Sequence, residues 1–230
     1  MSAIRILDVD DEPDIREVVD MSLGLNPDFE VRSCASGVEA LVTAAEWQPF
    51  LILLDVMMPS MDGPTTLTHL RKNPATADIP VVFMTARAQA REVERFISLG
   101  AQGVIPKPFD PMTLAFQVRS HLQAVRFGTL RGVFMRRAKS DAAILSPCRS
   151  SLAKQADPDA LSRIRGLAHR LAGAAGLFGF DRIGNDAAAL EDAVLAELGG
   201  SGTQGDIAHA LDRLLASVER EWGSPPAAVA

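Results

Sequence analysis

The sequence predicts two domains of different class, an α/β domain with a five-stranded parallel sheet and then an all-α four-helix bundle. Short apolar segments alternate with amphipathic ones in the first half, a basic stretch without acidic residues follows, and every later periodic segment has helical spacing. The chain has 230 residues, enough for two domains of ordinary size. We therefore expect an α/β domain over 1–125, a basic helical connector over 126–140, a bundle over 141–222 and a loose tail over 223–230.

The elements of the first domain follow from its apolar runs and from the residues that begin and end helices. Five segments are predicted as strands: Ile4–Val9, Phe29–Cys34, Phe50–Leu54, Pro80–Met84 and Gly103–Ile105. The third and fourth are continuously apolar, which is typical of parallel strands buried on both faces. Amphipathic spacing predicts helices between and after them over Pro13–Leu23, Ser36–Trp47, Pro64–Lys72, Ala88–Leu99 and Pro111–Val125. Strands that alternate with helices in this way favour a parallel sheet covered by helices on both faces.

The second domain is predicted to be helical throughout. The connector before it carries five basic residues and no acid, and we expect it to continue the last helix of the first domain; a nucleic-acid-binding patch is the alternative, although no helix-turn-helix is evident. Four helices are then predicted over Ala142–Gln155, Pro158–Phe178, Arg182–Leu198 and Gln204–Trp222. Four helices joined by short turns form an up-down bundle.

Composition excludes several classes of protein. The net charge of −6 argues against general affinity for nucleic acid or anionic lipid. No apolar run approaches the roughly 20 residues of a membrane span, and acidic residues begin at Asp8, too early for a signal peptide. Cys34 and Cys148 stand alone, without metal-ligand or disulfide spacing. We expect a cytoplasmic protein.

Polar side chains gather where the predicted strands end. Asp10 and Asp11 end the first strand, Asp55 follows the third, Thr85 the fourth and Lys107 the fifth. In a parallel sheet these ends lie at one edge, where ligands bind. Crowded carboxylates repel one another, and an all-oxygen site with room for water suits Mg²⁺. The lysine and the threonine could hold phosphoryl oxygens.

Four motifs in this half resemble the response-regulator receiver domain, which has a flavodoxin-like fold. They are Ile6–Glu12 (ILDVDDE), Leu51–Gly63 (LILLDVMMPSMDG), Val81–Ala86 (VVFMTA) and Pro106–Phe109 (PKPF). The resemblance covers about residues 3–125, with the motifs in the family's order and spacing. It implies that a sensor histidine kinase supplies phosphoryl groups.

The resemblance also implies residue roles. Asp55 would be the phosphoacceptor, and Thr85 and Lys107 would bind the phosphoryl group. The ligands of Mg²⁺ would be Asp10, Asp11, Asp55 and the main-chain carbonyl of Met57. A cis proline is expected at Pro108. The family usually has an aromatic residue three positions before the lysine, where this chain has Val104.

One histidine of the second half differs from the other three in its surroundings. His169 lies opposite the apolar stripe of its predicted helix, on the same side as Ala172, Gly173 and Gly176. A glycine inside a helix costs roughly 1 kcal/mol relative to alanine, so two beside an exposed imidazole need a reason. Small neighbours would let another protein reach the ring.

The segment Ala168–Gly179 (AHRLAGAAGLFG) and the later Leu190-Glu191 resemble a histidine-phosphotransfer (Hpt) domain over about residues 141–222. The resemblance implies that His169 carries a phosphoryl group. The family's usual lysine is Ala172 here, and we expect Arg165, one helical turn before the histidine, to replace it.

Together these features favour a phosphorelay protein that is not a metabolic enzyme. Asp55 would exchange phosphoryl groups with His169 or with a partner receiver. The alternative is a phosphorylation-gated adaptor or dimerisation module whose bundle no longer transfers phosphate, which Ala172 supports. A DNA-binding transcription factor is a further alternative.

Overall fold

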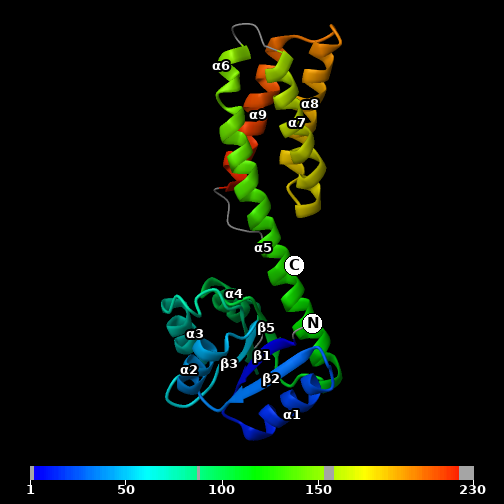
Figure 1. Ribbon diagram of the computed structural model, residues 1–230. Coiled ribbons are helices and arrows are strands. Elements are labelled where there is room, and N and C mark those ends of the chain that lie inside the picture. Colours follow the sequence, from blue (N-terminus) through cyan, green and yellow to red (C-terminus); the bar gives the residue numbers. More distant parts are fainter. Residues whose placement is uncertain (1–2, 87–88, 153–157, 223–230) are drawn as a thin grey trace. The chain divides into compact units, whose positions relative to one another are not determined.

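The computed structural model describes residues 3–86, 89–152 and 158–222, and the chain divides into two compact units, Met1–Val125 and Arg126–Ala230. In the described part of the first unit, five parallel strands form one sheet in the order β2-β1-β3-β4-β5 (Figure 1). The strands are β1 (Ile4–Val9), β2 (Phe29–Cys34), β3 (Leu51–Asp55), β4 (Val81–Thr85) and β5 (Gly103–Pro106). The predicted α/β class is confirmed.

Helices cover both faces of this sheet. On one face lie α2 (Gly37–Trp47), α3 (Gly63–Lys72) and α4 (Ala90–Ser98), whose apolar side chains form one core with those of the strands. On the other face lie α1 (Pro13–Gly24) and the first part of α5 (Pro111–Leu145). Every residue of β3 and β4 is buried, because both faces of these central strands are covered.

The central strands end one residue later than predicted, at Asp55 and Thr85. The loop after β3 folds tightly against it, since the main-chain amide of Gly63 donates to the carbonyl of Val56 at 3.1 Å. A Cβ on Gly63 would lie 2.4 Å from the carbonyl oxygen of Asp55, so this approach requires glycine. The Lys107–Pro108 peptide is cis, as the resemblance to receiver domains implies.

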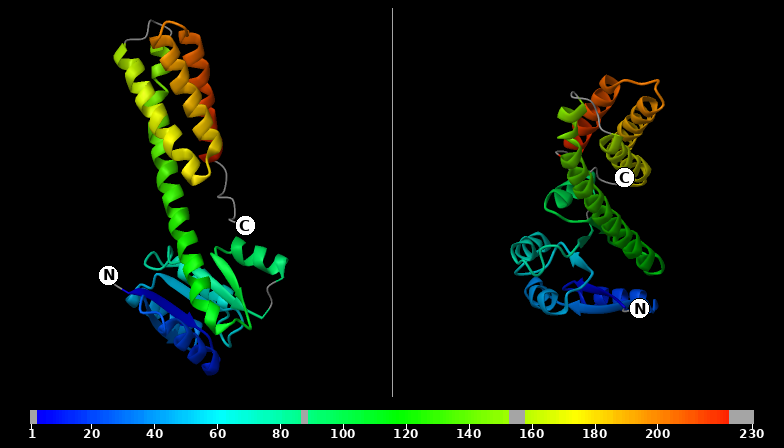
Figure 2. Two further views of the ribbon diagram at one scale, coloured as in Figure 1. Left: turned by 90° about the vertical axis from the view of Figure 1, so that its right-hand side faces the viewer. Right: turned by 45° about the horizontal axis from the view of Figure 1, so that its top comes forward.

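The second unit is helical in its described residues. It contains α6 (Cys148–Leu152), α7 (Pro158–Ala175), a short 3₁₀ turn η1 (Gly176–Phe178), α8 (Asp181–Leu198) and α9 (Gln204–Trp222). The second part of α5 lies beside α7, α8 and α9 around one apolar core, and successive long helices alternate in direction (Figures 1 and 2). The predicted helical bundle is confirmed. None of the helices in the described residues could cross a membrane.

The structure corrects the predicted connector and first bundle helix. Residues 126–140 were expected to precede the bundle, but Phe134, Met135 and Ala138 are buried in its core, so this part of α5 is the first bundle helix. The predicted helix Ala142–Gln155 is also wrong: α5 ends at Leu145 and α6 begins at Cys148. Proline at position 147, between these helices, disfavours helical geometry in the residue before it. Residues 153–155 and the predicted tail, 223–230, lie outside the described residues.

Candidate functional site

The carboxyl edge of the sheet brings together three of the residues predicted to act there: Asp55, Lys107 and Asp10, which directly follows β1. The ammonium nitrogen of Lys107 donates to Oδ2 of Asp10 at 2.5 Å and to Oδ1 of Asp55 at 2.6 Å. The other carboxylate oxygen of Asp55 accepts from the main-chain amide of Met57 at 2.7 Å. Oδ1 of Asp10 accepts from the amide of Glu12 at 3.0 Å. Each carboxylate is therefore held at both of its oxygens.

Burial and charge set the protonation of this cluster. Burial raises the pKa of Asp10, while its hydrogen bond and attraction to Lys107 oppose that rise. Burial alone would lower the pKa of Lys107, but its hydrogen bonds to Asp10 and Asp55 outweigh this and raise it. The lysine is therefore a cation at neutral pH, positioned beside the carboxylate that is expected to react.

Sequence reasoning gave no role to Asp8, which lies on β1 two residues before Asp10. Its side chain is 0% exposed, and neither carboxylate oxygen has a hydrogen-bond partner among the described residues. Burial first, and then the neighbouring charge of Asp10, raise the pKa of Asp8 well above its usual range. The only sequence signal was an acid within the apolar run from Ile6 to Val9.

The remaining residues predicted for this site lie near the same edge. Asp11, the second residue after β1, is half-buried. Thr85 is buried at the end of β4, where its carbonyl accepts from the amide of Lys107 at 2.7 Å. Within residues 3–86, 89–152 and 158–222, no three His, Cys, Asp or Glu side chains form a ready-made metal cage. The donors are nevertheless all oxygen, and the three carboxylates Asp10, Asp11 and Asp55 outnumber the single ammonium. This chemistry fits Mg²⁺, which keeps several waters.

In the second unit, His169 lies on the outer side of α7 and contacts α8. Its side chain is 74% exposed, and its Nδ1 lies 3.1 Å from both Oε1 and Oε2 of Glu191, whose side chain is 19% exposed. The carboxylate favours the tautomer with a proton on Nδ1, which leaves the lone pair on Nε2 free. The contact between residues 22 positions apart was not predictable from helical spacing.

The surroundings of His169 match the predicted pattern in part. The apolar stripe of α7 is buried, and Gly173 is exposed with nothing within 4 Å of the position a Cβ would take. Ala172, expected on the exposed side, is half-buried against the bundle core. Arg165 is exposed on α7, and its expected role beside His169 stays a prediction.

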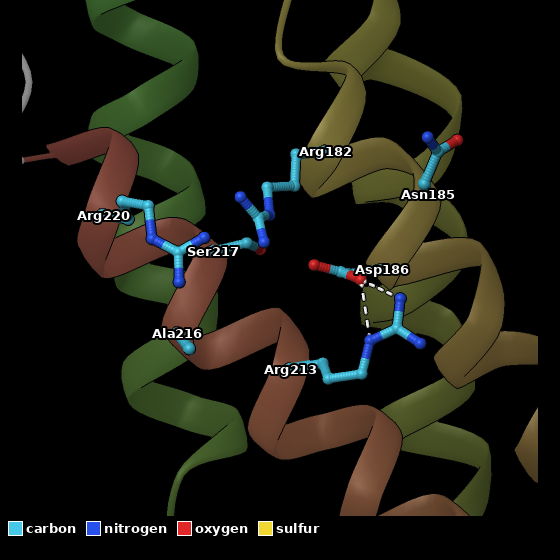
Figure 3. A pocket seen from close by; sticks show the side chains of 7 residues that line it. All are labelled: Arg182, Asn185, Asp186, Arg213, Ala216, Ser217 and Arg220. Atoms are coloured by element: carbon cyan, nitrogen blue, oxygen red, sulfur yellow. Dashed lines mark hydrogen bonds and ion pairs between the residues drawn. The ribbon is translucent and has the colours of Figure 1, made fainter.

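A separate cavity of about 480 Å³ lies between α8 and α9 (Figure 3). Arg182 and Arg220 line it, together with a buried carboxylate, Asp186, that accepts from Nε of Arg213 at 3.1 Å. Figure 3 shows this ion pair joining the two helices. His169 does not line this cavity, so the arginine cluster is not part of the histidine site.

Comparison with protein families matches both units. A response regulator receiver domain is found over residues 6–119 and an Hpt domain over residues 140–221. Similar curated proteins include the DNA-binding dual master transcriptional regulator RpaA of Synechocystis, 36% identical over 119 residues, 52% of this chain and 49% of that protein. The response regulator Rre1 of Synechocystis is 38% identical over 119 residues, 52% of each. The chain thus spans about half the length of the relatives it matches.

Solved structures of receivers resemble the first unit. The signal receiver domain of a putative LuxO repressor protein from Vibrio parahaemolyticus has a TM-score of 0.50 at 23% identity, covering 56% of this chain and 96% of that one. The chemotaxis response regulator CheY4 of Vibrio cholerae has a TM-score of 0.49 at 30% identity, covering 53% and 99%. The first of these likenesses supports the fold alone.

Proposed function

The chain belongs to the response regulator receiver family over residues 6–119 and to the Hpt family over residues 140–221, and on this premise we propose that it is a phosphorelay protein. Asp55 accepts a phosphoryl group from a sensor histidine kinase. His169 exchanges phosphoryl groups with Asp55 or with the receiver of a partner. These two domain types are typical of a signalling protein rather than a metabolic enzyme, and we place its action in the cytoplasm.

At Asp55, a carboxylate oxygen attacks the phosphorus of a phosphohistidine. The O–P bond forms while the P–N bond breaks, and the electron pair returns to the imidazole of the donor. Lys107, already 2.6 Å from this carboxylate, is placed to neutralise charge on the transferred oxygens. Asp10, Asp11, Asp55 and the carbonyl of Met57 would hold Mg²⁺, which supplies further neutralisation of phosphoryl charge when bound. Thr85 is proposed to bind a phosphoryl oxygen through its hydroxyl.

At His169, Nε2 attacks the phosphorus of an aspartyl phosphate. The N–P bond forms, the O–P bond breaks, and its electron pair returns to the aspartate. The ring keeps its Nδ1 proton during this step, and Glu191 faces the positive charge that develops on the imidazole. Phosphohistidine retains a high transfer potential, so the reaction can run in either direction.

The observation that carries the proposal is the exposed imidazole of His169, held by Glu191 at one nitrogen, in a chain that also has a receiver. The test is time-resolved phosphate tracing from a candidate histidine kinase, with wild type, Asp55→Asn and His169→Gln. We expect base-labile label at Asp55 and acid-labile label at His169. Retention of the base-labile label in Asp55→Asn would contradict the first assignment.

The adaptor alternative is not favoured. It rests on Ala172, which replaces the family's lysine, and it predicts no acid-labile phosphate on His169 under any donor. RpaA is a DNA-binding regulator, but this chain matches about half of that protein. We propose protein partners only, namely a kinase and a downstream receiver, and no nucleic acid.

A further inference from the structure

A cavity of about 430 Å³ opens beside His169 between α5 and α7. Its walls come from two helices: Phe134, Arg137 and Asp141 on α5, and His169, Arg170 and Gly173 on α7. The part of α5 that contributes was expected to be a connector, so the sequence did not indicate that this segment approaches the histidine.

The helical register fixes Arg137 on the face of α5 that looks into this cavity. Phe134, three residues earlier, and Asp141, four residues later, are both buried, so the three share one stripe. Arg137 lies between them and is exposed. Its neighbour Arg136, about 100° further around the helix, does not line the cavity.

Arg137 is the better placed of the two cations that line the cavity. Nη1 of Arg170 lies 3.9 Å from where a Cβ of Gly166 would stand, so that side chain leans back along α7. The space over Gly173 is open, because nothing stands within 4 Å of its Cβ position. Arg165 does not line the cavity.

The charge of the cavity suits a phosphoryl group. Among the described residues that line it there are one acid, Asp141, and two arginines, Arg137 and Arg170, so the cavity carries an excess positive charge. A phosphoryl group adds close to two negative charges at neutral pH. A guanidinium offers paired N–H donors to phosphoryl oxygens, which a bare helix surface at Ala172 and Gly173 cannot.

We propose that Arg137 of α5 binds the phosphoryl group on His169 and replaces the lysine that Ala172 has displaced. This inference rests on the proposed function of His169. While Glu191 holds Nδ1 from α8, Arg137 reaches Nε2 from α5. In the transfer, Arg137 donates N–H groups to the phosphoryl oxygens as the N–P bond forms and the bond to the aspartate breaks.

The experiment uses the full chain and phosphoramidate, a small donor that phosphorylates histidine. Acid-labile, base-stable phosphate that is absent from His169→Gln measures loading of His169, because the chain has three other histidines. A parallel set in an Asp55→Asn background excludes phosphate that reaches His169 through Asp55, and ³¹P NMR gives the chemical shift of the phosphoryl group. We compare wild type, Arg137→Ala, Arg137→Lys and Arg165→Ala, with Arg136→Ala as the matched control. Circular dichroism confirms that each variant is folded.

We expect Arg137→Ala to load His169 about tenfold more slowly, the effect of roughly 1.4 kcal/mol in the transition state. Its ³¹P shift should move, which a purely structural role would not cause. Arg137→Lys should recover most of the rate, and Arg136→Ala should match wild type. Equal rates and shifts in Arg137→Ala and Arg136→Ala would overturn the inference, as would a loss confined to Arg165→Ala.

Failure of the proposed function gives a different result. If His169 loads from phosphoramidate in an Arg137-dependent way but exchanges nothing with phosphorylated Asp55 or a partner receiver, the relay is wrong and the phosphoryl site stands. If no variant and no wild-type protein shows acid-labile phosphate, both are overturned.

Discussion

Gly63→Ala tests how the receiver positions the main chain of Asp55. The new Cβ would lie 2.4 Å from the carbonyl oxygen of Asp55, 2.9 Å from Cε1 of Phe83 and 3.0 Å from Cα of Val56. Two of these three atoms belong to the main chain of the β3 end, so they cannot rotate away as a flexible side chain could. The end of the strand must move, or the protein must bear the overlap.

The structure allows the cost to be estimated. Overpacking typically costs about 1–3 kcal/mol, and contact with main-chain atoms on two sides places this variant at the upper end, about 3 kcal/mol. Unfolding entropy of about 2.1 cal/mol/K per residue gives roughly 0.26 kcal/mol/K for a unit of this size, so the receiver should melt about 10 °C lower. Phosphorylation of Asp55 by acetyl phosphate should also slow at temperatures where the variant is folded.

Tryptophan fluorescence follows the receiver alone in a Trp222→Phe background, where Trp47 of α2 is the remaining tryptophan. The matched control is Gly24→Ala at the end of α1, where a Cβ has nothing within 4 Å. That control should melt at the parent temperature or slightly above it. If Gly63→Ala melts within about 2 °C of Gly24→Ala, the packing argument is refuted.

Three further predictions concern charge. Burial lowers the pKa of His121, so the folded protein binds a proton at this ring less readily than the unfolded chain does. The free energy of unfolding should therefore fall as the pH drops from about 6.5 through the lower pKa of the folded state. Denaturant unfolding at pH 7.5 and 5.5 should show a smaller fall in His121→Gln, and the same fall as in wild type in the exposed control His69→Gln. Glu191→Gln should slow phosphoryl transfer to His169 about tenfold in a quenched-flow assay, because an amide stabilises the developing imidazolium less well than a carboxylate does. An unchanged rate would show that the carboxylate has no part in the transfer. Asp8→Val should raise the free energy of unfolding at pH 7 by about 1–3 kcal/mol, since it replaces a buried carboxyl that has no hydrogen-bond partner among the described residues. A free energy of unfolding below that of wild type would show that the carboxyl has a hydrogen-bond partner in solution.

Local sequence patterns were enough to predict the elements of the receiver and the exposed position of His169. Strand limits were correct to within one residue at Leu51–Asp55 and Val81–Thr85, because continuous apolar runs mark strands that are buried on both faces. The convergence of Asp55 and Lys107 followed from parallel topology, since strand ends that share one edge must lie close together.

The sequence could not supply contacts that depend on tertiary packing. The arginines of residues 126–140 suggested a connector, and they obscured Phe134, Met135 and Ala138, whose helical spacing faces the bundle core. Because residues 126–140 were predicted to lie before the bundle, the sequence did not indicate that Arg137 lines the same cavity as His169. Partners from separate helices, such as Glu191 and His169, have no periodic signal because their separation is set by how α7 packs on α8.

The glycines of α7 have a consequence for hydrogen exchange. Gly166 and Gly173 each lower the helical propensity of this segment by about 1 kcal/mol relative to alanine. The helix that carries His169 therefore keeps its form through its buried stripe. The amide protons of its last turn, which contains Gly173, should exchange sooner than those of its buried middle turns. Opening there would release the imidazole from Glu191 without unfolding α8 or α9. His169 would then alternate between a state held by Glu191 and a state free of it, at the rate at which the end of α7 opens and closes.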